Sequence, residues 1–224
     1  MKKLLLCFLF CSCLRISAQS YISRTAASAD LVAFDQTLRE MHADPFRFVT
    51  EQTYEQALQA TRAAWGDSIR ITDFLLQLYR LTAILQDGHC APHIVQPVLR
   101  PELVKEQFFP LPLVFHAQRA YLDKHTTDSL QVAPGTELVA INQQATTALL
   151  HRFGQYYGGL PGFREEMGHR IFPYFLLLHG IQAPFTLTLK TPKGEVQYIT
   201  IEKGSNFRNA LALQMPGISK AFDF

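Results

Sequence analysis

The feature that most constrains this 224-residue chain is a cluster of prolines near its middle. Between Ala91 and Pro112 there are five of them: Pro92, Pro97, Pro101, Pro110 and Pro112. Proline lacks a backbone N–H and fixes φ, so this density excludes a long helix and is typical of extended chain. We therefore expect a linker over residues 91–107, with one folded unit on each side of it.

Residues 28–90 have the three- and four-residue hydrophobic spacing of amphipathic helices. The apolar side of the first helix consists of Leu31, Phe34, Leu38 and Met41. Ser28 or Asp30 can cap this helix at its start. It ends at Asp44-Pro45, because the residue before a proline avoids helical backbone angles.

Two further helices are expected in the same unit. Thr53 can cap the second, which stops near Gly66-Asp67. The third begins at Thr72 and runs to Leu85. Three amphipathic helices with short connections predict a small bundle.

Residues 108–204 predict a β-rich unit, and the chain as a whole is therefore expected to be of the α+β class. Strand-like segments lie at 111–115, 120–122, 137–141, 185–190 and 196–202. Thr191-Pro192-Lys193-Gly194 supplies turn residues between the last two, which predicts a hairpin. Two helices are expected in this unit, over 146–156 and 165–178.

The first 18 residues have the parts of a secretory signal peptide. Lys2 and Lys3 precede a short apolar run, and small residues lead to a cleavage site after Ala18. The run is shorter than the roughly 20 apolar residues that cross a bilayer, so no stable membrane insertion is expected after cleavage. Lipid attachment at Cys13 is the alternative. We expect a secreted or periplasmic protein whose mature N-terminus occupies residues 19–27.

Charge and cysteine content exclude two further classes of protein. Without Lys2, Lys3 and Arg15 the chain has 18 basic and 19 acidic residues, so no basic surface for nucleic acid is expected. Cys90 is the one cysteine beyond the leader, and no internal disulfide can form.

The most distinctive local motif is Leu85-Gln86-Asp87-Gly88-His89, at the end of the third helix. Gly88 can end that helix in a left-handed turn, which puts His89 on a loop beyond it. A histidine held there by Asp87 could act as general base for a serine hydroxyl. The alternative is that Asp87-Gly88 only stops the helix and that His89 is a surface residue.

The residues next to His89 raise two alternatives, a metal site and a thiol nucleophile. His89, Cys90 and His93 could supply three zinc ligands, but Pro92 prevents the helical face that would align them. Cys90 is a poor nucleophile beside His89, because adjacent side chains of an extended chain point in opposite directions. We therefore expect neither a metal nor another cofactor.

The sequence shows no serine with the surroundings of a nucleophile that His89 could activate. Ser205 and Ser219 are the only serines after residue 135, and neither lies in a Gly-x-Ser-x-Gly motif. Six other histidines are interpreted as structural or exposed: His42, His116, His125, His151, His169 and His179.

Taken in order, three segments resemble the tail-specific (carboxy-terminal-processing) serine peptidases, in particular the branch related to the tricorn core and interphotoreceptor retinoid-binding protein. The first, His42-Ala43-Asp44-Pro45-Phe46, is similar to the family's histidine-proline turn after its first helix. The second, residues 81–89, is similar to its L-x-x-L-x-D-x-H segment. The third, residues 134–142, is similar to a segment of its PDZ-like domain. The last departs from the family at Gln143, where glycine is usual.

The resemblance implies a serine endopeptidase in which a helical region and a PDZ-like domain precede an α/β domain. That domain would supply the serine and the oxyanion hole, and the chain is expected to contain only its start, over residues 205–224. In the tricorn-like branch His89 would be the base, whereas in the other branch a lysine of the later domain takes that role. Polypeptide substrates or peptide termini would add as a strand along a sheet edge, with Leu111, Leu113 and Phe115 as the candidate groove.

Two other classes of function stay open. The chain could be a stand-alone exported module that binds peptides or apolar ligands, or a structural protein of the cell envelope. Peptide binding without any cleavage would favour the first, and no residue pattern favours the second.

Overall fold

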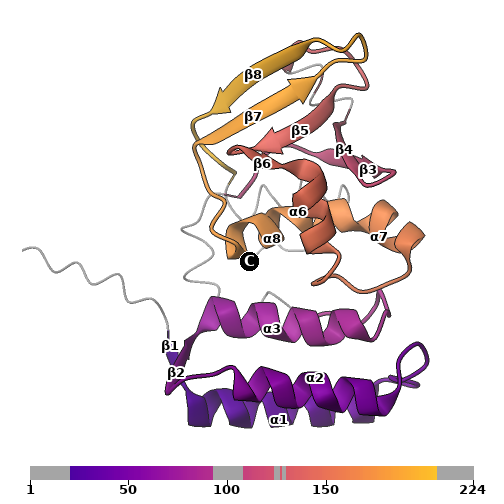
Figure 1. The fold of residues 1–224 in the computed structure, drawn as a ribbon, viewed down its shortest axis with the longest axis vertical. Helices are drawn as coiled ribbons and strands as arrows, with labels where there is room; N and C mark the ends of the chain where they lie inside the picture. Colours follow the sequence, from indigo (N-terminus) through magenta and orange to yellow (C-terminus); the bar gives the residue numbers. More distant parts are fainter. Residues whose placement is uncertain (1–20, 93–107, 124–126, 128–129, 206–224) are drawn as a thin grey trace, which may run out of the picture.

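The computed structural model describes residues 21–92, 108–123, 127 and 130–205. The expected signal peptide with Cys13 and Ala18, His93 and the rest of the linker, and nearly all of 205–224 lie outside these ranges. The described chain contains both helices and antiparallel strands, consistent with the α+β class (Figure 1). The first part is mainly helical, and the second contains a sheet with helices against one face.

The helical part consists of three helices and a pair of short strands. In chain order these are β1 (Tyr21–Ser23), α1 (Arg24–Met41), α2 (Glu51–Ala63), β2 (Ser68–Arg70) and α3 (Ile71–Ile84). The strands β1 and β2 pair antiparallel, and α1 and α2 lie on the side of α3 away from the sheet (Figure 1). One hydrophobic cluster joins all these elements, and its most deeply buried members are Ala27, Leu31, Tyr54, Leu81 and Leu85.

Two of the expected helix caps are wrong, because both helices begin earlier than the residues expected to cap them, Ser28 or Asp30 for the first and Thr53 for the second. Helix α1 is capped by Ser23, whose Oγ accepts a hydrogen bond from the backbone N–H of Ala26 at 3.2 Å. In the same way Thr50 caps α2 by accepting from the N–H of Thr53 at 3.2 Å. Several residues near each helix start could cap it, and pairing of β1 with β2 decides the position in α1.

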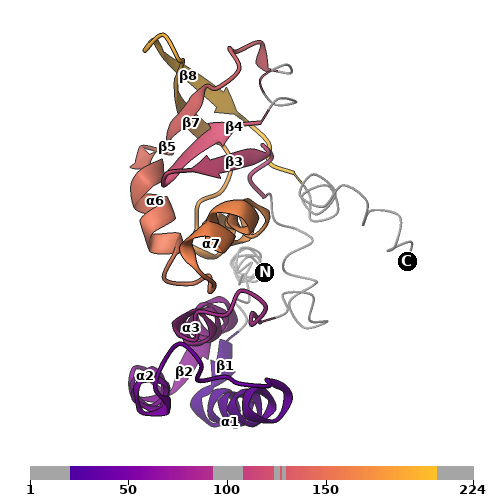
Figure 2. The same ribbon diagram turned by 90° about the vertical axis from the view of Figure 1, so that its right-hand side faces the viewer.

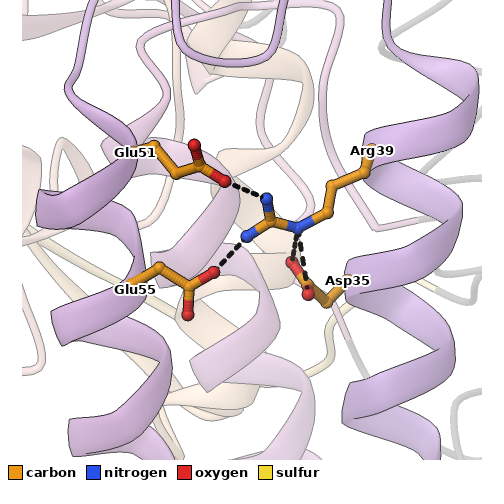
Figure 3. Close-up of polar contacts among 4 residues, drawn as sticks. All are labelled: Asp35, Arg39, Glu51 and Glu55. Atoms are coloured by element: carbon orange, nitrogen blue, oxygen red, sulfur yellow. Dashed lines mark hydrogen bonds and ion pairs between the residues drawn. The ribbon is translucent and has the colours of Figure 1, made fainter.

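A charged network joins α1 to α2 on the surface of the helical part (Figure 3). The Arg39 guanidinium binds Asp35 one turn earlier on α1 at 3.0 Å, and it also pairs with Glu51 and Glu55 of α2. The same group lies over the ring of Phe46, 5.2 Å from its centroid. A single cation thus holds three carboxylates from two helices.

The β-rich part is built on an antiparallel sheet with the strand order β3-β4-β5-β7-β8, and β6 pairs with β5. The strands are β3 (Leu113–His116), β4 (Arg119–Leu122), β5 (Glu137–Ile141), β6 (Gln144–Ala145), β7 (Phe185–Lys190) and β8 (Val196–Ile201). The expected hairpin at 185–202 is confirmed as β7 and β8, in register from Phe185–Ile201 to Lys190–Val196. Strands β3 and β8 form the two edges of the sheet.

The hairpin of β5 and β6 turns tightly without glycine. Asn142 and Gln143 join β5 to β6 with φ of 47° and 64°. Positive φ at both central residues is the pattern of the type I′ turns that suit twisted hairpins. The turn after Asn142 therefore forms although Gln143 stands where the resembled family has glycine.

Helices cover one face of the sheet and lie between it and α3 (Figures 1 and 2). They are α6 (Thr146–Phe153), α7 (Pro161–Met167), the 3₁₀ turn η1 (Gly168–Arg170) and α8 (Phe172–Leu178). The single helix expected over 165–178 is wrong, because the chain breaks at Gly168. A Cβ there would lie 2.9 Å from the ring of Phe153, and Pro173 opens the new helix α8.

The two parts of the chain meet along α3 and α8. Leu75 and Tyr79 of α3 pack in one buried cluster with Tyr174 and Leu177 of α8 and with Phe108. Among the described residues no helix has the length and apolar character needed to cross a membrane.

Candidate functional site

The loop after α3 carries the histidine that the sequence analysis selected. The helix ends at Ile84, and Gln86 takes the left-handed conformation with φ of 55°. The expectation that Gly88 is the left-handed residue at the end of the helix is therefore wrong. Glycine is needed at 88 for another reason: a Cβ there would lie 2.1 Å from the ring of Phe163 on α7.

Asp87 fixes the loop that follows. Its Oδ1 accepts a hydrogen bond from the backbone N–H of His89 at 2.8 Å and lies 3.3 Å from Nδ1 of the same residue. The hydrogen bond from the His89 N–H is the main cause that lowers the pKa of the Asp87 carboxyl. Asp87 is thus an ionised carboxylate at neutral pH, in contact with an imidazole.

His89 extends from this loop with 92% of its side chain exposed. Its ring centroid lies 5.9 Å from that of Phe163, and within the described residues its hydrogen bonds go to Asp87 alone. With Nδ1 turned to the carboxylate, Nε2 is open to accept a proton from a group outside the loop. A carboxylate beside one imidazole nitrogen, with the other nitrogen open, is also found in catalytic triads, where the histidine is the general base.

His42 belongs to the same site, although the sequence analysis counted it among the scattered histidines. It follows α1 directly, and its Nε2 lies 3.1 Å from Oδ2 of Asp87. The backbone N–H of Asp44 donates to its Nδ1 at 3.2 Å. Because 45 residues separate His42 from Asp87, no local spacing could have indicated the pair.

The neighbouring Cys90 is poorly suited to nucleophilic chemistry. Its side chain packs against the core of the helical part, and burial raises the pKa of its thiol to about 11. Within the described ranges no three His, Cys, Asp or Glu side chains are arranged to hold a metal ion. His93, the third residue of the zinc alternative, lies outside those ranges.

The candidate peptide groove is placed differently from the expectation. Leu113 and Phe115 point into the core of the β-rich part, with 5% and 8% of their surface exposed, and Leu111 packs partly against the same core. Their side chains therefore stabilise the sheet and do not line an open groove. The exposed side chains of β3 are those of Val114, at 51%, and His116.

The backbone of β3 offers an edge for strand pairing. His116 and Arg119 close the two-residue turn to β4, and such a pair exchanges both backbone hydrogen bonds. Since hydrogen-bonded pairs alternate with non-bonded ones, Leu113 and Phe115 direct their N–H and C=O groups away from β4. Glu165 of α7 pairs with His116 and accepts from the N–H of Ala117, which ties α7 to this hairpin.

Other histidines of the described chain have structural surroundings. Nδ1 of His179 lies 3.0 Å from the carbonyl oxygen of Phe175, and burial lowers the pKa of the imidazole. Burial likewise lowers the pKa of His169, whose ring lies beside Phe115. Neither ring contacts the Asp87 loop.

Comparison with solved structures finds a fold resemblance to CPAF, a chlamydial serine protease. The match to mature CPAF complexed with lactacystin has a TM-score of 0.50 and 15% identity, and it covers 80% of this chain and 35% of that one. A CPAF mutant gives a TM-score of 0.50 and 17% identity, with 80% and 34% covered. The chain thus spans about a third of the length of these proteins, and the likeness concerns the fold. No family model and no curated protein matches the sequence.

Proposed function

We propose that this chain is the front portion of an exported serine endopeptidase of the tail-specific type, supplying a wall of the active-site cleft and the recognition of peptides. The observation that carries the proposal is the Asp87–His89 pair, in which an ionised carboxylate holds an imidazole whose other nitrogen is open. A fold like that of a serine protease supports it. His89 is the general base, and the serine it would activate lies outside the described residues.

The branch of the family is part of this proposal. In the tricorn-like branch the histidine of the Asp-x-His segment pairs with the serine, and here His89 stands at that position. A base supplied by a lysine elsewhere would leave His89 with a structural role. The contact of Asp87 Oδ1 with Nδ1 of His89 supports the first arrangement, since a general-base histidine is oriented by a carboxylate in this way.

Peptide recognition is assigned to the backbone edge of β3 in a PDZ-like domain. The outward N–H and C=O groups of Leu113 and Phe115 can pair with an extended peptide, as in other cases of strand addition. A new strand at this edge would lie beside Val114, whose side chain is exposed. The same edge supports the second candidate function, a stand-alone module that binds peptides and cleaves none.

Peptide binding by the full chain tests the recognition step. We expect labelled extended peptides to bind in fluorescence anisotropy, and Val114→Lys to weaken binding at least tenfold, because a charge on an edge strand opposes pairing. Tyr198→Lys is the matched control, since Tyr198 is exposed on the opposite edge strand β8. Equal loss in both variants, or no saturable binding, contradicts the assignment.

The peptidase assignment has a separate test. In a protein that contains the nucleophile domain, His89→Ala should abolish peptide cleavage while binding at β3 persists. Wild-type turnover by that variant would assign the base elsewhere. Cleavage absent from every form of the protein, with binding intact, would favour the stand-alone module.

A further inference from the structure

The strongest unassigned feature is the contact of two histidines with the two oxygens of one carboxylate. Oδ1 of Asp87 faces His89, and Oδ2 lies 3.1 Å from Nε2 of His42. His42 comes from the end of α1, whereas Asp87 and His89 follow α3. We infer that His42 is a positioning residue that, through Asp87, sets the orientation and the tautomer of His89. The inference rests on the proposed role of His89 as general base.

The protonation of His42 follows from its own contacts. Its Nδ1 accepts the backbone N–H of Asp44 at 3.2 Å, so this nitrogen carries no proton in the neutral ring. The proton is then on Nε2, which donates to Oδ2 of Asp87. The turn after α1 thus selects the one tautomer of His42 that can hold the carboxylate.

A restraint on Oδ2 of Asp87 also fixes the position of its Oδ1. The Asp87 side chain is 27% exposed and could rotate if only the His89 loop restrained it. The hydrogen bond from His42, whose side chain is only 21% exposed, restrains Oδ2. Oδ1 therefore remains within hydrogen-bond distance of the backbone N–H and of Nδ1 of His89. The carboxylate then favours the proton of His89 on Nδ1, and this leaves Nε2 as a proton acceptor.

The Asp87 carboxylate is the main restraint on the orientation of the His89 ring. The His89 side chain is 92% exposed, and its ring is tilted against that of Phe163, with the centroids 5.9 Å apart. An exposed imidazole without a partner exchanges between tautomers, and only one of them can take a proton through Nε2. His42 therefore acts on His89 without touching it or a substrate.

The test reads the tautomers of both rings in the full chain, with the imidazole nitrogens labelled by ¹⁵N, at a pH where the rings are neutral. We expect His42 to be protonated on Nε2 and His89 on Nδ1. In His42→Gln the amide nitrogen occupies the place of Nε2 and can still donate to Asp87, so His89 should keep its tautomer. In His42→Asn the side chain is too short to reach Asp87, and the preference of His89 should be lost.

Backbone amide spectra show whether each variant is folded, and the wild-type tautomers test the inference without any variant. A His89 ring protonated mainly on Nε2 in the wild type would overturn it. So would an unchanged His89 tautomer in folded His42→Asn. The readout uses no peptide, so failure here leaves peptide binding at β3 untouched, and failure of the peptidase proposal leaves the tautomers as stated.

Discussion

Each part of the molecule has a hydrophobic core, but in the helical part a network of charged side chains also links the helices, whereas in the β-rich part the core is dominated by aromatic rings. Arg39 joins α1 to α2, and Asp87 joins the end of α1 to the loop after α3. On the other side of α3, helices α6 and α8 pack on each other through the stacked and edge-on rings of Phe153, Phe172 and Phe175. The ring of Phe172 also lies edge-on to that of Phe115 in β3. Loss of ring volume in the β-rich part should therefore cost more stability than loss of charge in the helical part, and the effect of lost charge alone should depend on salt.

The largest effect is expected for Phe172→Ala in the β-rich part. Phe172 is fully buried, and its ring centroid lies 5.3 Å from that of Phe115 and 5.6 Å from that of Phe153. Removing the ring leaves a cavity and should lower the free energy of unfolding by about 3–5 kcal/mol. Urea unfolding measures the change. Tyr198→Ala, at a residue 74% exposed, is the control and should stay within about 0.5 kcal/mol.

A smaller effect is expected for Arg39→Met in the helical part. The substitution leaves Asp35, Glu51 and Glu55 without their shared cation and removes the contact with the ring of Phe46. Because Glu51 and Glu55 are 58% and 41% exposed, the loss should be about 1–2 kcal/mol and should shrink at high salt.

Arg70→Met is the matched control for that network. Arg70 forms an exposed pair with Asp73 one turn away, and its removal should cost about 0.5 kcal/mol or less. If both substitutions cost the same, the network of Arg39 does not link the two helices, and the contrast between the two parts of the molecule fails.

The smallest of the three stability effects is expected for Asp87→Asn, and it should depend on pH. The folded state lowers the pKa of Asp87, so the carboxylate stabilises the fold above its unfolded pKa of about 3.9 and loses this effect as the pH falls through the folded value. Near neutral pH the variant should be about 1 kcal/mol less stable than the wild type. Unfolding curves should converge in acid, and a gap that widens below pH 4 would contradict this account.

Local patterns predicted the elements of the sheet well. The strand at 137–141 and the hairpin at 185–201 match the structure within a residue, because alternation and turn residues act over short distances. The break after Met167 was missed, although Pro173 inside the expected helix lacks the N–H that a continuous helix needs there. The helix starts at Arg24 and Glu51 were missed because several nearby residues could cap each helix.

The candidate site was only half visible in the sequence. Asp87 and His89 are two residues apart, so their contact could be expected from the chain itself. His42 could not be added, because it reaches Asp87 only when the end of α1 lies beside the end of α3. The same limit applies to Leu113 and Phe115, whose alternation marks a strand but does not tell which side of it faces the core.

The central claim, peptide recognition at the edge of β3 that faces away from β4, is tested most directly by amide hydrogen exchange. Leu113 and Phe115 direct their N–H groups outward from β3. On β7 the backbone of Thr186 bonds to Asn142 and therefore not to β8. The same holds two residues on for Thr188, so its partner Tyr198 directs its N–H outward from β8. A saturating extended peptide should slow exchange at Leu113 and Phe115 and leave Tyr198 unchanged. Protection at β8 alone, or at neither edge, would contradict the account.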